Sequence, residues 1–217
     1  MVQPSSRPTG RALPAAPSVT GAALTGLVLA AGAGRRYGGP KALAITADGT
    51  PWLHLAVAAL RAGGCARVLV TLGAGASDAL PLVPPGVEPV LVPGWNEGIA
   101  ASLRHGLGAA GGHGADAVVV VTVDTPTMPA GAVRRIASAA GPDPTDALVQ
   151  AVYGGRPGHP VLIGRRHVPA ITAAVSRDVG ARPYLLANAA REVECGDLWD
   201  GADLDGRSEG PAQPSRS

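Results

Sequence analysis

The chain has 217 residues, a net charge of +2 and only 3% aromatic residues, with no Phe. This length allows one domain of ordinary size with a substantial core. Without a basic stripe or a set of base-stacking rings, the sequence gives no case for a nucleic-acid or anionic-membrane partner. No apolar run approaches the roughly 20 residues of a membrane-spanning helix.

The terminal segments and the cysteines indicate the bounds of the domain and its cellular location. Residues 1–23 are rich in Pro, Ser, Ala and Gly and lack the compact apolar region of a secretory signal, so we predict a disordered leader. Residues 207–217 have the same character, which leaves a domain over residues 24–206 and a cytoplasmic location as the expectation. Cys65 and Cys195 each lie beside a predicted strand end and are expected to be free, semi-buried thiols.

In chain order, the first predicted element is the apolar run Leu27–Ala31, which is typical of a strand buried on both faces. The next predicted elements are a helix from Pro51 to just before Gly63, strands at 66–72 and 90–92, a helix at 98–110, a strand at 117–123, a helix at 130–140, strands at 147–153 and 160–163, helices at 165–175 and 180–190, and a last strand at 192–195.

This alternation of strands and helices predicts a three-layer α/β/α domain with a mostly parallel sheet. The most hydrophobic run, Ala117–Val123, is the predicted central strand. In such sheets, ligands bind beyond the carboxyl ends of the strands. The loop Gly32–Lys41, the turn at Asp124 and the turn Pro93–Gly98 all follow predicted strands, so we expect them to converge.

The loop after the first strand combines glycines at 32, 34, 38 and 39 with Arg35, Arg36 and Lys41. Glycine lets the backbone approach a ligand closely and point its N–H groups inward, while Arg and Lys neutralise phosphate. The loop is therefore a candidate triphosphate cradle.

Two better-known phosphate-binding patterns do not fit this loop. A P-loop needs Gly-Lys followed by Ser or Thr, whereas Pro40 precedes Lys41 and Ala42 follows it. The dinucleotide fingerprint meets Tyr37 at its third glycine, and its ribose-binding acid is missing where the second strand runs into Leu72-Gly73.

The loop resembles the signature L-A-[AG]-G-x-[GS]-x-R-x-G-x-x-K of the MobA-like NTP transferases, which include molybdenum cofactor cytidylyltransferase and guanylyltransferase. Tyr37 stands where Met is more usual. The resemblance implies a Rossmann-like nucleotidyltransferase fold, with Arg36 and Lys41 as catalytic residues on the triphosphate. The sequence Ala30-Ala31-Gly32 favours the cytidylyltransferase branch of the family and therefore CTP as the nucleotide. The implied nucleotide-binding residues are Leu29, Ala30, Ala31, Gly32, Ala33, Gly34, Arg36, Lys41 and Ser102.

Nucleotidyl transfer also calls for carboxylates that hold Mg²⁺. Asp124 ends the valine-rich strand ahead of Thr125-Pro126; a turn or helix cap is the alternative interpretation. The resemblance makes Asp124 a catalytic residue and a magnesium ligand. Asp203-Leu204-Asp205 partly matches a second acidic segment of the family, which carries Asp205 over as a second ligand, with a solvated acidic tail as the alternative.

Three further segments extend the resemblance. Residues 94–107, which contain Ser102, resemble a segment of the cofactor cytidylyltransferases, although packing explains their apolar positions equally well. Residues 155–162 resemble G-x-x-G-H-P-V-L, and residues 178–182 resemble the end of G-D-x-G-A-R, with Arg177 in place of the first Gly. The resemblance implies that His159, Asp178 and Arg182 bind the acceptor; a structural hydrogen-bonding role for His159 is the alternative.

The resemblance implies a Mg²⁺-dependent enzyme that transfers CMP from CTP to a phosphorylated acceptor, molybdopterin carrying molybdenum, and releases pyrophosphate. A molybdoenzyme is then the expected recipient of the finished cofactor. One alternative acceptor is a sugar phosphate or another phosphorylated metabolite. A different class of function, a non-catalytic module that binds the molybdenum cofactor and hands it on, also stays open.

Overall fold

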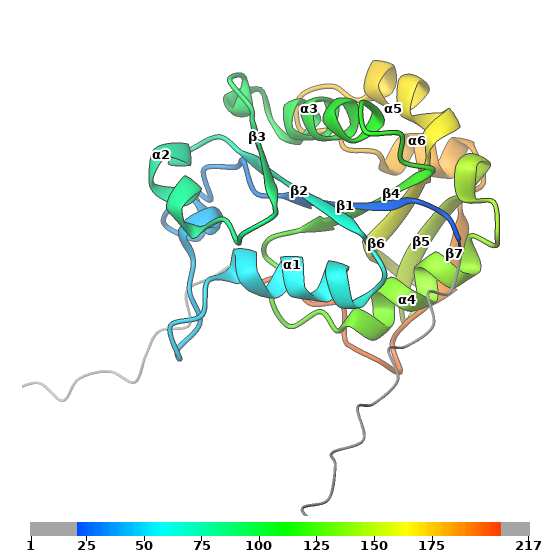
Figure 1. Ribbon diagram of the computed structural model, residues 1–217, viewed down its shortest axis with the longest axis horizontal. Coiled ribbons are helices and arrows are strands. Elements are labelled where there is room, and N and C mark those ends of the chain that lie inside the picture. Colours follow the sequence, from blue (N-terminus) through cyan, green and yellow to red (C-terminus); the bar gives the residue numbers. More distant parts are fainter. Residues whose placement is uncertain (1–20, 205–217) are drawn as a thin grey trace, which may run out of the picture.

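The fold is known from a computed structural model, which describes residues 21–204 of the chain. Seven strands form one sheet in the order β3-β2-β1-β4-β6-β5-β7 (Figure 1). The central position of β4 confirms the prediction from its hydrophobicity. The strands are β1 Leu24–Leu29, β2 Arg67–Leu72, β3 Glu88–Leu91, β4 Ala117–Thr122, β5 Leu148–Tyr153, β6 Arg156–Gly164 and β7 Arg191–Glu194.

Helices cover both faces of the sheet, with α1 and α4 on one face and α3, α5 and α6 on the other (Figure 1). Two clusters of buried apolar side chains, one on each face, fill the space between sheet and helices. The predicted three-layer α/β fold is therefore confirmed. The helices are α1 Trp52–Ala62, α2 Ala76–Ala79, α3 Ile99–Gly111, α4 Ala130–Ala139, α5 Val168–Ala174 and α6 Arg182–Ala187; the 3₁₀ turns are η1 Lys41–Leu43, η2 Leu80–Leu82, η3 Trp95–Glu97, η4 Pro144–Asp146 and η5 Arg165–His167.

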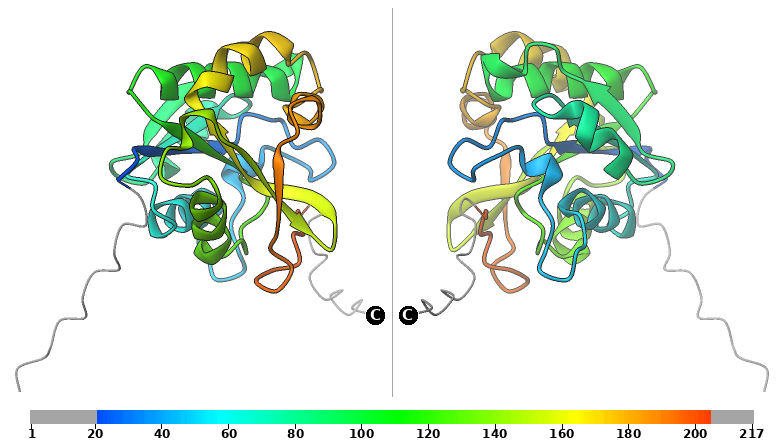
Figure 2. Two further views of the ribbon diagram at one scale, coloured as in Figure 1. Left: turned by 90° about the vertical axis from the view of Figure 1, so that its right-hand side faces the viewer. Right: turned by 90° about the vertical axis from the view of Figure 1, so that its left-hand side faces the viewer.

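Strand β6 runs against its neighbours, while the other paired strands are parallel. It forms a hairpin with β5 through Gly154 and Gly155, whose φ angles of 58° and 74° suit a two-residue turn. Because β6 is antiparallel to β4, it begins at the edge where β4 ends. In Figure 2, the tip of this hairpin lies beside the loop that follows β7.

Several element boundaries differ from the sequence predictions. Strand β6 begins four residues before the predicted start, because Arg156 and Pro157 still pair with β5. The predicted helix over 180–190 is shorter, since Ala189 has a left-handed φ of 48° that ends the helical path. The short α2 was not predicted.

The structure also tests the expectations that the two cysteines are free and that no segment spans a membrane. Cys65 and Cys195 are free, as predicted, and with 3% and 0% of their surface exposed they are buried more deeply than expected. Among residues 21–204, no helix has the length and apolar character needed to cross a lipid bilayer.

Candidate active site

A cavity of about 420 Å³ lies at the carboxyl ends of β1 and β4, within the usual size range of small-molecule sites. The three loops expected to converge there all contribute to it. The predicted site residues that line it are Leu29, Ala30, Ala31, Gly32, Ala33, Gly34, Arg36, Lys41, Ser102, Asp124 and Asp178.

The Gly-rich loop needs its glycines for two different reasons. Gly34 has a left-handed φ of 57°, and its carbonyl accepts hydrogen bonds from the N–H groups of Gly38 and Gly39 at 2.9 and 3.1 Å. A Cβ atom on Gly34 would collide with the carbonyl oxygen of Gly39. Gly32, in contrast, is exposed, and a methyl group there would meet no protein atom, which leaves that space to a ligand.

The base of the loop is held by a buried hydroxyl on β2. Thr71 Oγ1 accepts the Ala30 N–H at 3.2 Å and donates to the Val28 carbonyl at 3.3 Å. Nearby, the Ala74 N–H donates to the Ala31 carbonyl at 3.0 Å. Thr71 was not singled out in the sequence; its only signal is a polar residue within the buried part of β2.

Lys41 and Asp124 meet across the cavity. The Lys41 Nζ lies 2.9 Å from Asp124 Oδ2, and the two side chains are 13% and 22% exposed. The Tyr37 ring, whose centroid is 6.0 Å from Nζ, packs in turn against Trp52 at 5.3 Å between ring centroids. The Tyr37 ring thus offers Lys41 a cation–π interaction, which gives the unusual residue at this position a physical role.

The backbone around Asp124 is fixed on three sides. The Val123 N–H donates to the Leu29 carbonyl at 3.1 Å, and the Thr125 hydroxyl donates to the Thr122 carbonyl at 2.8 Å. The Asp124 carbonyl itself accepts the N–H of Leu204 at 2.9 Å. The carboxylate is therefore presented from a rigid turn.

The donor set at this edge suits one mode of Mg²⁺ binding. The described part of the chain contains no cluster of three or more His, Cys, Asp or Glu side chains able to hold a metal ion. Mg²⁺ commonly binds through one or two carboxylates and takes its other ligands from substrate phosphates and water. Asp124, which lines the cavity beside the Gly-rich loop, fits this mode. Asp205, the predicted second ligand, lies outside the described residues.

His159 lies close to Asp124 but does not line the cavity. Strand β6 pairs Val161 with Val120 in the antiparallel direction, so the preceding His159 falls near the end of β4. Burial lowers the pKa of its imidazole, and the negative charges of Asp124 and Asp203 oppose this shift. Its carbonyl accepts the Tyr153 hydroxyl at 2.6 Å.

The two other predicted acceptor residues are separated by the structure. Asp178 lines the cavity, whereas Arg182 begins α6 and is not part of the lining. The loop that carries Asp178 packs closely on Gly98, where a Cβ atom would collide with it. Arg177, which replaces a family glycine, has a left-handed φ of 50°, so this position keeps the conformation that favours glycine.

The fold and the cavity define the class of the protein. In a mostly parallel α/β domain, a cationic Gly-rich loop and a carboxylate at a strand end line one cavity. This is the arrangement of a Rossmann-like nucleotidyltransferase. Comparison with known families gives the particular assignment. The chain belongs to the MobA-like NTP transferase domain family, whose model matches residues 26–193. It is accordingly an enzyme of the nucleotidyltransferase type.

Among characterised relatives, the chain is 32% identical over 195 residues to nicotine blue oxidoreductase from Paenarthrobacter nicotinovorans, which covers 84% of this chain and 92% of the relative. Its fold is similar to that of Rv0371c from Mycobacterium tuberculosis H37Rv, with a TM-score of 0.72, 29% identity, and coverage of 86% of this chain and 94% of that one. A manganese complex of Rv0371c is also similar, with a TM-score of 0.64, 27% identity and coverage of 80% and 88%. Of these relatives, one is named as an oxidoreductase, and the names of the Rv0371c structures state no reaction.

Proposed function

We propose that the chain transfers CMP from CTP to a phosphorylated acceptor, with molybdopterin as the first acceptor to test, and releases pyrophosphate. The observation that carries the proposal is the single cavity lined by the Gly-rich loop, Lys41 and Asp124. The loop provides room and cations for a triphosphate, and Asp124 provides an oxygen ligand opposite it. Membership of the NTP transferase family supports the same reaction class.

In this reaction, an oxygen of the acceptor's phosphate attacks the α-phosphorus of CTP, a new P–O bond forms, and the bond to the β-phosphate breaks. The loop backbone orients the triphosphate for this in-line attack. Arg36 and Lys41 stabilise the negative charge that develops on the leaving pyrophosphate. Because the attacking phosphate oxygen is already ionised, the reaction needs no strong general base, and none of these residues has to form a covalent intermediate.

We assign the magnesium ligand role to Asp124, with a carboxylate of the segment 203–205 as the second ligand. A bound Mg²⁺ supplies charge neutralisation between the phosphates. The Lys41 ammonium lies 2.9 Å from the Asp124 carboxylate, which places the proposed phosphate-binding cation beside the proposed metal ligand. The manganese complex of the similar Rv0371c supports a divalent ion in this fold.

The test is a screen for pyrophosphate release with all four NTPs against molybdopterin and common sugar phosphates. Release with CTP and molybdopterin supports the proposal. Release with a sugar phosphate alone assigns the alternative acceptor, and binding of molybdopterin without any turnover assigns the non-catalytic carrier role. The cytoplasmic location and the hand-over to a molybdoenzyme stay predictions.

A second candidate function rests on the 32% identity to nicotine blue oxidoreductase. An oxidoreductase of this kind needs a source of electrons, which a nicotinamide dinucleotide would supply. In that case, the Gly-rich loop would hold the pyrophosphate of this cofactor. The absence of an acid where β2 ends at Leu72 weighs against it, since dinucleotide-binding folds hold the ribose there. Oxidation of NADH or NADPH with nicotine blue as acceptor, measured beside the pyrophosphate screen, distinguishes the two.

A further inference from the structure

The described segment after β7, residues 195–204, runs along the carboxyl edge of the sheet and reaches the turn at Asp124. We call it the C-terminal strap. It contains no helix or strand, yet the N–H of Leu204 donates to the Asp124 carbonyl at 2.9 Å. Asp203, the residue before, acts electrostatically on His159 together with Asp124. The strap thus brings the backbone next to a second acidic residue, Asp203, into contact with the turn that carries the proposed metal ligand.

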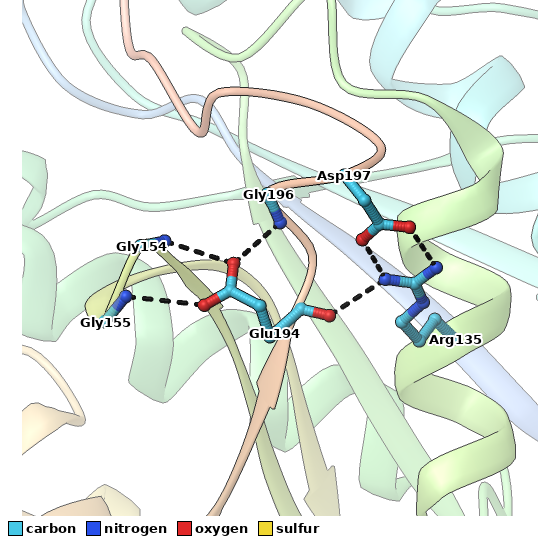
Figure 3. Close-up of polar contacts among 6 residues, drawn as sticks. All are labelled: Arg135, Gly154, Gly155, Glu194, Gly196 and Asp197. Atoms are coloured by element: carbon cyan, nitrogen blue, oxygen red, sulfur yellow. Dashed lines mark hydrogen bonds and ion pairs between the residues drawn. The ribbon is translucent and has the colours of Figure 1, made fainter.

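The first anchor of the strap is an ion pair with helix α4. The guanidinium of Arg135 contacts both carboxylate oxygens of Asp197, with an Nη2–Oδ2 distance of 2.8 Å (Figure 3). The same guanidinium donates to the Glu194 carbonyl at 2.9 Å. One arginine therefore fixes the last residue of β7 and the start of the strap in a bidentate geometry.

The carboxylate of Glu194 forms the second part of this anchor. It accepts N–H groups from the hairpin turn, Gly154 at 3.1 Å and Gly155 at 3.4 Å, and from Gly196 of the strap at 2.7 Å (Figure 3). These backbone hydrogen bonds lower the pKa of Glu194, and the hydrogen bond with Arg135 lowers the pKa of Asp197. Both carboxylates therefore stay ionised at neutral pH.

Further along, the strap is held by Trp199 and Gly201. The Trp199 Nε1–H donates to Thr127 Oγ1 at 3.0 Å, and its ring meets the ring of Tyr153 edge-on at 5.3 Å. Gly201 has a left-handed φ of 74° and packs so closely on the Tyr153 ring that a Cβ atom would collide with it. From Asp197 to Leu204, side-chain and backbone contacts replace the regular hydrogen bonds that the strap lacks.

We propose that Arg135, Asp197 and Glu194 are positioning residues that fix the C-terminal strap so that Asp203 stands beside Asp124 at the metal site. An irregular segment provides a usable ligand only when supporting contacts hold it within about 0.5 Å of its place. The inference rests on the proposed metal-assisted function. If the contacts only joined α4 to the sheet, their loss would leave metal affinity unchanged.

The experiment compares five variants with the wild-type chain, one of which, Asp203→Asn, removes the proposed ligand itself. Arg135→Met and Asp197→Asn break the anchor, and Asp197→Glu keeps its carboxylate. Arg134→Met is the matched control, since Arg134 is the neighbouring arginine on α4 but donates to the Ala62 carbonyl at 2.9 Å, away from the strap. Melting curves establish that each variant is folded.

Two readouts are independent of turnover: hydrogen–deuterium exchange of peptides that contain the Leu204 amide, and the affinity for Mn²⁺ alone by electron paramagnetic resonance. We expect Arg135→Met and Asp197→Asn to speed exchange and weaken Mn²⁺ binding about tenfold, the usual scale for outer-shell supports. Asp197→Glu should retain most of both properties, and Arg134→Met all of them. Asp203→Asn should weaken Mn²⁺ binding without faster exchange.

The inference is overturned if exchange stays slow in the two anchor variants, if exchange quickens while Mn²⁺ affinity is unchanged, or if the wild-type chain binds no Mn²⁺. Failure of the proposed function has a different signature, namely no pyrophosphate release by the wild-type chain with any NTP. Exchange and Mn²⁺ binding still decide the role of the anchor in that case.

Discussion

Replacing Lys41 with Met should increase the affinity of the protein for a divalent ion while abolishing most nucleotidyl transfer. The Lys41 ammonium lies 2.9 Å from Asp124 Oδ2, so an ion that binds this carboxylate first has to displace it. At an effective dielectric constant of about 20, two unit charges at this distance attract each other by roughly 6 kcal/mol. Desolvation of both groups offsets much of this, and the net value of a charged hydrogen bond is about 1.5–3 kcal/mol.

That net value sets the size of the effect. With Lys41→Met, Mn²⁺ alone should bind about tenfold to a hundredfold more tightly than to the wild-type chain, by the usual conversion of free energy into affinity. Electron paramagnetic resonance of Mn²⁺ titrations measures this change. Arg35→Met is the control, because it removes the same charge from the same loop without touching the Lys41–Asp124 pair. An unchanged or lower Mn²⁺ affinity in Lys41→Met would refute the reasoning.

With CTP present, we expect the wild-type chain to bind Mn²⁺ more tightly than the Lys41→Met variant. On the proposed function, the triphosphate should attract Lys41 in the wild-type chain and leave Asp124 to the ion, so nucleotide and metal should strengthen each other's binding. The Lys41→Met variant lacks this exchange and should show little gain of Mn²⁺ affinity with CTP. Pyrophosphate release should fall by about 10²-fold or more, since a cation on the developing charge is lost.

Three further changes test other parts of the molecule. Arg177→Gly should stabilise the fold by about 1 kcal/mol in urea unfolding, since it removes a side chain from a left-handed backbone position (φ 50°); a loss of stability would show that the Arg177 side chain contributes more than its backbone costs. Gly34→Ala should abolish nucleotide binding in calorimetry with little loss of the far-UV spectrum, because the new Cβ collides with the Gly39 carbonyl; wild-type affinity would contradict the assigned loop geometry. Burial raises the pKa of Cys65 to about 12 and also that of Cys195, so the folded chain keeps both protons above pH 9 while the unfolded chain loses them. Stability should therefore fall as pH rises from about 9 toward 12, and iodoacetamide should label both thiols only after unfolding; rapid labelling of the native chain would contradict the burial.

Most of the fold was accessible from the sequence because the elements on which it depends have strong local signals. Strand β4 is an unbroken apolar run, and α1 has an apolar stripe between Pro51 and Gly63. The direction of β6 was not accessible in the same way. A hairpin and a crossover connection differ in the geometry of the Gly154-Gly155 turn, and strand propensity carries no information about direction.

In the candidate site, too, only the residues with a strong local signal were predictable from the sequence. The Gly-rich loop and Asp124 were found because phosphate chemistry constrains residue types over a short stretch of chain. Thr71, Arg135 and Trp199 were not found, because each acts on a segment more than 40 residues away and is an ordinary residue in its own neighbourhood. Arg182 was assigned to the acceptor by its motif, but the start of α6 carries it away from the cavity lining.

The reversed strand β6 has a consequence for how such a site can diversify. One side of this edge of the sheet is formed by the loop after β1, which lines the cavity, and the other side by the beginning of β6 and its hairpin with β5, whose residues do not line it. The two sides are encoded more than 100 residues apart, and they share no backbone hydrogen bond between loop and hairpin among those of the described chain. Substitutions around residues 154–160 can therefore change the surface beside the cavity while leaving the Gly-rich loop as it is, which is one route by which proteins of a single architecture can come to differ in function.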